Sequence, residues 1–310
     1  MFLVRNLGVA KQQRVSGSAI CRGFARLNAP HENFITNEFI EAASARLLRD
    51  KKTRVTDVNQ FLTLFRSEMN SSNYINFLER CGRRKILQPN HVFAIGNGLL
   101  YCKDENPVSL NEIDKLFQSL GYMSAKHRST RALLVATSFK LKNSDNALTG
   151  AHIGKYINAL RDMRSGHPEV RELLEVLTEK IAGSDDKLTA HDATLALSGL
   201  QCLSSEYAEV RSMVRELSSK LSQACEGKLN NEQFITVMLG IRRLRNDHTE
   251  VQNLLQALMM RVDTEAQDVV NAHQCREALS VAENVVVHKS DGTEELLAHL
   301  NRILSTLTSE

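Results

Sequence analysis

The sequence predicts an all-α protein, an α-solenoid of antiparallel helix pairs that recur every 40–41 residues. Two observations predict this fold directly: apolar residues follow a helical spacing through most of the chain, and the same pattern returns after a fixed interval. A third observation agrees with them. Only 4 of the 310 residues are proline, so long helices run uninterrupted and a turn-rich all-β fold is disfavoured.

The repeat is clearest between residues 148 and 262. Leu160, Leu200 and Ile241 occupy the same place in three successive copies, and a Glu-Val pair follows each of them at the same distance. A fair copy precedes these three, and a degenerate one closes the chain. The predicted repeats cover residues 108–147, 148–187, 188–228, 229–266 and 267–310.

Each repeat contains two helices with one apolar face, such as Ile153–Met163 and Pro168–Ile181. Proline is favoured at the first position of a helix, and Pro168 stands at the start of the second stretch. Neither helix can bury its apolar stripe alone, so successive pairs must stack. We therefore expect Leu160, Leu200 and Ile241 to be buried between layers, and we expect no sheet. A period of 40–41 indicates HEAT/armadillo-like repeats, since tetratricopeptide and pentatricopeptide repeats are shorter.

Residues 31–107 are less regular. Their apolar spacing predicts four helices, at Phe34–Leu48, Val55–Met69, Tyr74–Cys81 and His91–Cys102. We interpret this region as a divergent helical N-terminal region or cap of the solenoid. A separate small helical domain is the alternative.

Residues 1–30 have the composition of a mitochondrial presequence. They contain five Lys or Arg residues and no Asp or Glu, and their apolar and basic residues fit an amphipathic helix. Arg22 lies three residues before a predicted cut after Phe24, which resembles a matrix-peptidase site. This pattern predicts a flexible, removable N-terminus and location in the mitochondrial matrix. A basic N-terminal arm with another role is the alternative.

Charge is unevenly distributed along the rest of the chain. Residues 31–143 contain 17 basic and 11 acidic side chains, whereas residues 144–310 contain 17 basic and 25 acidic ones. The basic front favours contact with RNA or use as a basic partner interface, and the acidic back favours protein contacts. No apolar run approaches the length that spans a bilayer, so we expect no membrane insertion.

Catalytic and metal-binding signatures are missing from the sequence. It has no phosphate-binding Gly-Lys-Ser/Thr loop, no H-E-x-x-H and no G-x-S-x-G. Its six cysteines include no C-x-x-C pair, which is typical of free thiols in a reducing compartment. We therefore expect no enzyme activity, no cofactor and no metal site.

Basic clusters are the main candidates for binding. Arg and Lys gathered together suit phosphate contacts. The RNA-binding candidates are Arg80, Arg83, Arg84, Lys85, Lys126, Arg128 and Arg131, and the secondary basic patch is Arg242, Arg243 and Arg245. Five nearby aromatic residues are candidates for stacking on bases: Tyr74, Phe77, Phe93, Tyr101 and Tyr122.

Structural roles compete with these interpretations. Cations near a helix C-terminus are favoured by the helix dipole alone, and helix aromatics often belong to the core. Arg131, Arg171 and Arg211 recur in register, as residues do when they pair with a glutamate of the adjacent repeat.

The repeat stretch 158–174, with its echo at 198–211, resembles the helical-repeat proteins of protist mitochondria. Together with the presequence, residues 108–304 most resemble the HEAT/armadillo-like subunits of the kinetoplastid RNA editing substrate-binding complex. The resemblance implies a non-catalytic scaffold that handles guide RNA and messenger RNA in uridine-insertion/deletion editing, with other subunits of a ribonucleoprotein complex as partners. The alternative is a structural or assembly subunit of the mitoribosome or a respiratory complex that acts only through protein contacts.

Overall fold

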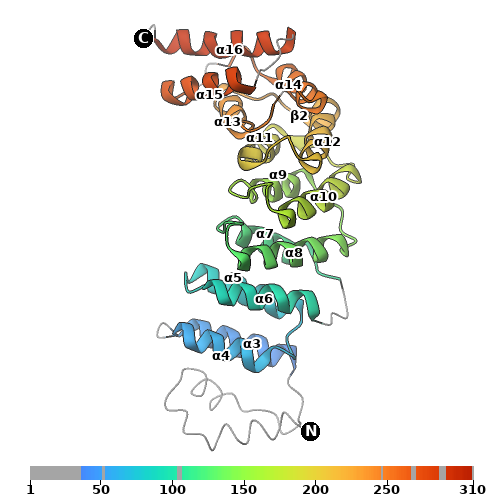
Figure 1. The fold of residues 1–310 in the computed structure, drawn as a ribbon, viewed down its shortest axis with the longest axis vertical. Helices are drawn as coiled ribbons and strands as arrows, with labels where there is room; N and C mark the ends of the chain where they lie inside the picture. The colour runs from blue at the N-terminus through green and yellow to red at the C-terminus, as the bar shows by residue number, and fades with distance from the viewer. Residues whose placement is uncertain are drawn as a thin grey trace, which may run out of the picture.

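A computed structural model describes residues 36–308, apart from residues 51–52, 103–106, 246, 267–269 and 286–290. The predicted presequence, residues 1–30, lies outside the described residues. In the described part, fourteen α-helices are stacked in pairs along the long axis of the molecule (Figure 1). The predicted all-α solenoid is therefore confirmed.

The seven helix pairs follow one another in chain order. They are α3 (Asn37–Arg49) with α4 (Val55–Phe65), α5 (Ser71–Arg83) with α6 (Pro89–Tyr101), α7 (Leu110–Leu120) with α8 (Arg128–Lys142), α9 (Gly150–Asn158) with α10 (Pro168–Ala182), α11 (Ala190–Ser198) with α12 (Ala208–Ala224), α13 (Asn231–Gly240) with α14 (Thr249–Arg261), and α15 (Ala272–Val285) with α16 (Asp291–Thr308). A short 3-10 helix, η1 (Gly199–Cys202), extends α11.

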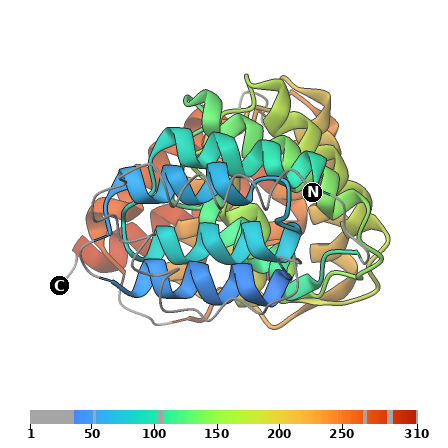
Figure 2. The same cartoon turned by 90° about the horizontal axis from the view of Figure 1, so that it is seen from below.

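The pairs build two layers. Odd-numbered helices pack on one another from α3 to α15, and even-numbered helices do the same from α4 to α16. Seen from the N-terminal end, the two helices of the first pair lie side by side, and later pairs are rotated behind them (Figure 2). Helices α3 to α6 join the same two layers, because α5 packs on α7 and α6 packs on α8.

Repeated capping residues set where the first helix of each repeat begins. The side chains of Thr149, Thr189 and Asn230 each accept a hydrogen bond from the backbone N–H three residues later. This bond satisfies one of the donors that a helix start leaves open. Pro168 opens α10 as the sequence predicts.

The core lies between the two layers. Leu160, Leu200 and Ile241 are fully buried, as predicted. Within the layer of odd-numbered helices, α9 and η1 approach closely, because a Cβ added to Gly199 would lie 2.3 Å from the carbonyl oxygen of Ile157. No side chain fits there, so this glycine allows two neighbouring helices to pack backbone against backbone.

The expectation of no sheet is wrong in one detail. Strands β1 (Leu188–Thr189) and β2 (Cys225–Glu226) form a two-residue parallel pair. The residues ahead of α11 and α13 run extended into their N-caps, and the repeat places one connection beside the next. A single parallel bridge between Leu229 and Val262 arises in the same way one pair later.

Two further observations concern the described residues alone. No described helix combines the length and the apolar character that crossing a bilayer requires. The five described cysteines carry free thiols, and no described group of His, Cys, Asp and Glu is arranged to hold a metal ion. The buried thiol of Cys81 has its pKa raised to about 12 by burial, so this thiol stays protonated.

Candidate nucleic-acid interface

The solenoid has two edges, which we name by the segments that form them. The turn edge joins the two helices of each of the first six pairs and comprises the described residues within 50–54, 84–88, 121–127, 159–167, 199–207 and 241–248. The loop edge joins successive pairs and comprises the described residues within 66–70, 102–109, 143–149, 183–189, 225–230 and 262–271. The two edges lie at opposite ends of the stacked helices (Figure 1).

Contacts between successive turns make the turn edge continuous. Arg84 donates to the backbone carbonyl of Asp50, at 3.0 Å, in the preceding turn. Further along, the backbone N–H of Ser204 donates to the hydroxyl of Ser165, at 3.0 Å. The side chains on this edge therefore form one surface that runs along the stack.

The loop edge is also continuous, and it is held mainly through the backbone. The hydroxyl of Ser184 donates to the carbonyl of Leu148 at 2.6 Å, and the N–H of Gly150 donates to the carboxylate of Asp186 at 2.7 Å. The ammonium group of Lys220 donates to the carbonyls of Ser184 and Asp186. Cations near the ends of helices thus form hydrogen bonds that join a helix to the neighbouring loop.

The two edges carry opposite charge in the described residues. The basic side chains of the turn edge outnumber the acidic ones by nine to four: Arg54, Arg84, Lys85, Lys126, Arg161, Arg164, Arg242, Arg243 and Arg245 against Asp50, Asp162, Glu206 and Asp247. On the loop edge the ratio reverses to three against seven: Arg66, Lys187 and Lys228 against Glu68, Asp145, Asp185, Asp186, Glu226, Asp263 and Glu265.

The first predicted cluster divides into structural and exposed members. Arg80 forms an ion pair with Glu41 of α3, and Arg84 donates to the last carbonyls of α3. Lys85 adopts a left-handed conformation, with φ of 54°, just after α5 ends. Its side chain is exposed, and so is that of Arg83, which pairs with Glu79 one helical turn earlier and remains 74% exposed.

The second cluster lies one turn further along the same edge. Lys126 is exposed, and the guanidinium of exposed Arg128 lies 5.6 Å from the centre of the Phe93 ring. Arg131 instead holds the carbonyl of Ala125 at 3.1 Å and pairs with Glu169 of the next repeat at 3.3 Å. The structural role considered for Arg131 is the one the contacts show.

This arrangement recurs in the next repeat. Arg171 pairs with Glu209 at 3.3 Å and donates to the carbonyl of Ser165 at 2.9 Å. The repeated arginine therefore braces its own turn and ties one repeat to the next. Arg211 also holds the carbonyl of its own turn, at Ser205.

The secondary basic patch lies on the same edge but apart from the others. Arg242, Arg243 and Arg245 are exposed in the turn between α13 and α14, where Arg245 pairs with Asp247 at 3.2 Å. The turn between α11 and α12 separates this patch from the first two clusters. That turn contains no Lys or Arg, and its charged residue, Glu206, is exposed.

Sequence reasoning missed two cations that extend the basic surface. Arg161 and Arg164 are exposed in the turn between α9 and α10, next to the second cluster. They lie in the acidic back half of the chain, and a charge count along the sequence hides them. The repeat register could have found them. It aligns Arg161 with Gly121, which lies in the turn of the second cluster one repeat earlier.

The five candidate aromatics differ in accessibility. Tyr74 and Phe77 are buried, so they are core residues and the prediction that they stack on bases is wrong. Burial raises the pKa of Tyr74 to about 12, and its hydroxyl donates to the carbonyl of Arg66 at 2.9 Å. Tyr101 is 79% exposed but lies at the loop-edge end of α6. Tyr122, at 86% exposure, lies in the turn beside Lys126.

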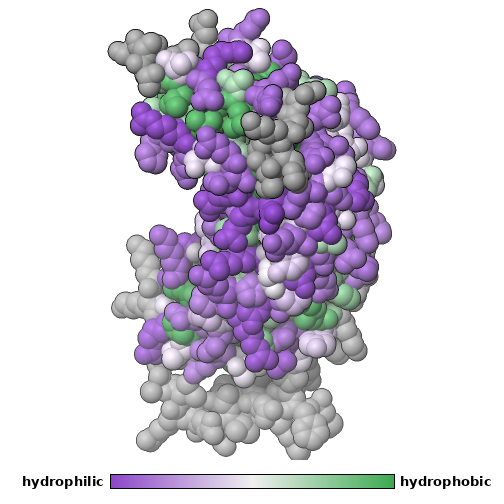
Figure 3. Space-filling model, turned by 45° about the horizontal axis from the view of Figure 1, so that its top comes forward, coloured by the Kyte–Doolittle hydropathy of each residue, from purple (hydrophilic) through white to green (hydrophobic). Residues whose placement is uncertain are grey.

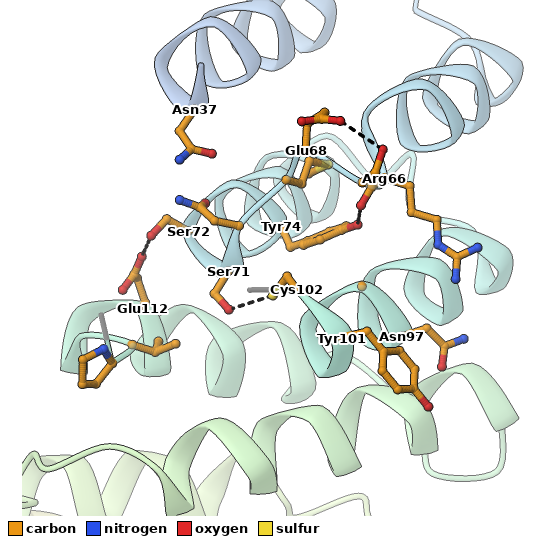
Figure 4. Close-up of a pocket in the computed structure, with 16 residues that line it drawn as sticks. Asn37, Arg66, Glu68, Ser71, Ser72, Tyr74, Asn97, Tyr101, Cys102 and Glu112 are labelled. Carbon is orange, nitrogen blue, oxygen red and sulfur yellow. Dashed lines mark hydrogen bonds between the residues drawn. The ribbon is translucent and has the colours of Figure 1, made fainter. Parts of the chain in front are cut away.

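A cavity of about 560 Å³ opens on the loop edge near the N-termini of α3, α5 and α7 (Figure 4). Its polar groups are engaged in local structure. Burial alone would raise the pKa of Glu112, but hydrogen bonds from Ser72 and Ser109 outweigh it and lower that pKa. Glu112 thereby caps α7 and joins it to α5. Ser71 and Cys102 also contact each other here, at 3.3 Å.

The surface is hollowed on one flank between the two ends of the stack, and the walls of the hollow are mostly hydrophilic (Figure 3). The turns that join α5 to α6, α7 to α8 and α9 to α10 lie on this flank (Figure 1). A polar hollow on the flank where these turns lie suits a flexible polyanion better than a compact apolar ligand.

No family model, no curated protein and no solved structure matches this chain.

Proposed function

We propose that this protein is a non-catalytic scaffold that binds RNA along its turn edge. The observation that supports the proposal is the excess of exposed cations on that edge and at the helix ends next to it: Arg83 at the end of α5, Lys85, Lys126, Arg128 at the start of α8, Arg161 and Arg164 follow one another over three successive turns. Phosphate contacts of this kind supply affinity without reading base sequence.

The proposal also covers where the protein is located and to which complex it belongs. The acid-free, arginine-bearing residues 1–30 support import into the mitochondrial matrix. The resemblance of the repeats to the editing substrate-binding complex supports a place in an RNA-processing ribonucleoprotein complex, with guide RNA and messenger RNA as ligands. The acidic loop edge would face protein subunits of that complex.

The second candidate is a structural or assembly subunit that acts only through protein contacts. The observation in its favour is that residues 31–310 contain more acidic than basic side chains, 36 against 34. This candidate predicts no RNA binding by the isolated protein at low salt.

Two matched variants test the proposal. The turn-edge variant replaces Lys85, Lys126, Arg164 and the adjoining Arg128 at the start of α8 by Gln, and the loop-edge variant replaces Arg66, Lys187, Lys228 and the adjoining Lys142 at the end of α8 by Gln. Each removes four positive charges. Arg80, Arg84 and Arg131 are left unchanged, because their contacts hold neighbouring helices and turns together.

Filter binding to a single-stranded RNA at several salt concentrations provides the measurement. The log of affinity should fall with the log of salt, at a slope of about −0.7 for each phosphate neutralised. The turn-edge variant should flatten that slope, by up to about 2.8 if all four cations contact phosphates. The loop-edge variant should behave as wild type. Equal effects of both variants, or no binding by wild type, would refute the proposal.

A further inference from the structure

Tyr122 is the most exposed large apolar side chain among those described, at 86%. It lies in the turn between α7 and α8, where only its backbone takes part in the turn, donating to the carbonyl of Ser119 at 3.4 Å. The same repeat position holds Asp162 in the next copy and Cys202 in the one after. The repeat therefore does not require an aromatic residue at this position.

Tyr122 shares the turn edge with several cations. Lys126 and Arg128 follow it in the same turn and the start of α8, and both are exposed. The turn that carries Arg161 and Arg164 is directly adjacent, because a Cβ on Gly121 would lie 3.7 Å from the Cα of Ala159. No hydrogen bond or ion pair joins the side chains of Lys126 or Arg164 to another described residue. Arg161 donates a hydrogen bond to the side chain of Gln201 at 3.2 Å and remains exposed.

An exposed aromatic ring near exposed cations has a specific use in nucleic-acid binding. Bases of a single strand stack on such rings while the backbone phosphates meet the cations. A duplex keeps its bases paired and stacked inside, so it offers the ring no free base face.

We infer that the turn edge selects single-stranded over double-stranded RNA, with one base stacked on Tyr122 and the adjacent phosphates on Lys126, Arg128, Arg161 and Arg164. This inference rests on the proposed function and adds the form of RNA and the contact that selects it.

Stacking is tested by removing the ring while keeping all charges. In the full chain, Tyr122→Ala should weaken binding of a 20-nucleotide oligouridine by roughly 5- to 150-fold. Tyr122→Phe should bind as wild type, because the ring remains. Tyr101→Ala is the matched control, since Tyr101 is 79% exposed but lies at the loop-edge end of α6. A 20-base-pair RNA duplex should bind Tyr122→Ala and wild type equally.

Fluorescence gives a second readout of the same contact. The chain contains no tryptophan, so Tyr122→Trp introduces a single tryptophan whose fluorescence can be excited selectively, and Tyr101→Trp provides its control. Oligouridine should quench the fluorescence of Tyr122→Trp and leave that of Tyr101→Trp unchanged.

The outcomes separate the inference from the proposed function. Wild-type binding that Tyr122→Ala leaves unaltered, without quenching in Tyr122→Trp, would overturn the inference and leave RNA binding by the cations intact. Equal losses for the duplex and the single strand would also overturn it. No binding of either RNA by wild type would refute the proposed function itself.

Discussion

The two edges of the solenoid use their cations differently. Beside the loop edge, Lys180, Lys220 and Arg261 lie near the C-terminal ends of α10, α12 and α14 and donate to backbone carbonyls of the preceding loop. On the turn edge, Arg131 and Arg171 brace the repeats, and other cations beside them stay exposed. In the same repeat, cations near the helix ends stabilise the stack at the loop edge. At the turn edge, some cations stabilise the stack and others remain exposed.

The largest expected change in the free energy of unfolding comes from the core, which lies between the two edges. Leu200→Ala should lower the free energy of unfolding by about 2–5 kcal/mol, because it opens a cavity between the two layers. Leu64→Ala on α4, where the side chain is 47% exposed, should change it by less than about 0.5 kcal/mol. Urea denaturation of both variants checks this. Equal small effects would mean that Leu200 does not join the layers.

A matched pair of lysines tests the division between the edges. Lys220→Met on the loop edge should cost about 1–3 kcal/mol, because the carbonyls of Ser184 and Asp186 lose their donor. Lys126→Met on the turn edge should cost less than about 0.5 kcal/mol, because its side chain is exposed and unpaired in the described structure. Thermal or urea unfolding measures both, and a reversed order would break the comparison.

The smallest expected effect is a pH dependence near the turn edge. His91 is buried at the start of α6, and burial lowers its pKa below the ordinary 6.5. Below pH 6.5 the unfolded chain takes up a proton that the folded protein resists, so stability should fall as the pH drops from 6.5 toward the lowered pKa.

His91→Gln removes this group and keeps an acceptor for the backbone N–H of Gln88, which His91 now binds at 3.2 Å. Between pH 7 and pH 5, the free energy of unfolding should change less for His91→Gln than for wild type. Equal changes in the two proteins would show that His91 does not cause the pH dependence.

The sequence predicted the layers because periodicity dictates them. Leu160, Leu200 and Ile241 recur at positions that only a stacked helix pair buries, so their burial followed from the repeat alone. Some helix starts were predictable from local sequence. Proline is favoured at the first position of a helix, and Pro168 opens α10.

The candidate binding surface was harder to predict, because it depends on which cations already have partners within the protein. Arg80 is paired with Glu41, and Arg84 with carbonyls of α3, across nearly one full repeat. From the sequence alone, these two residues were RNA-binding candidates on the same footing as Arg83 and Lys85. Arg161 and Arg164 were missed because charge was counted along the chain, whereas stacking sorts it between two edges.

Ultraviolet crosslinking of the isolated protein to a single-stranded oligouridine, with the crosslinked peptides mapped by mass spectrometry, tests the central claim most directly. The account predicts crosslinks within residues 121–128 and 159–167 of the turn edge, and their loss at high salt. Crosslinks concentrated in residues 183–189 and 225–230 of the loop edge, or none at low salt, would contradict it.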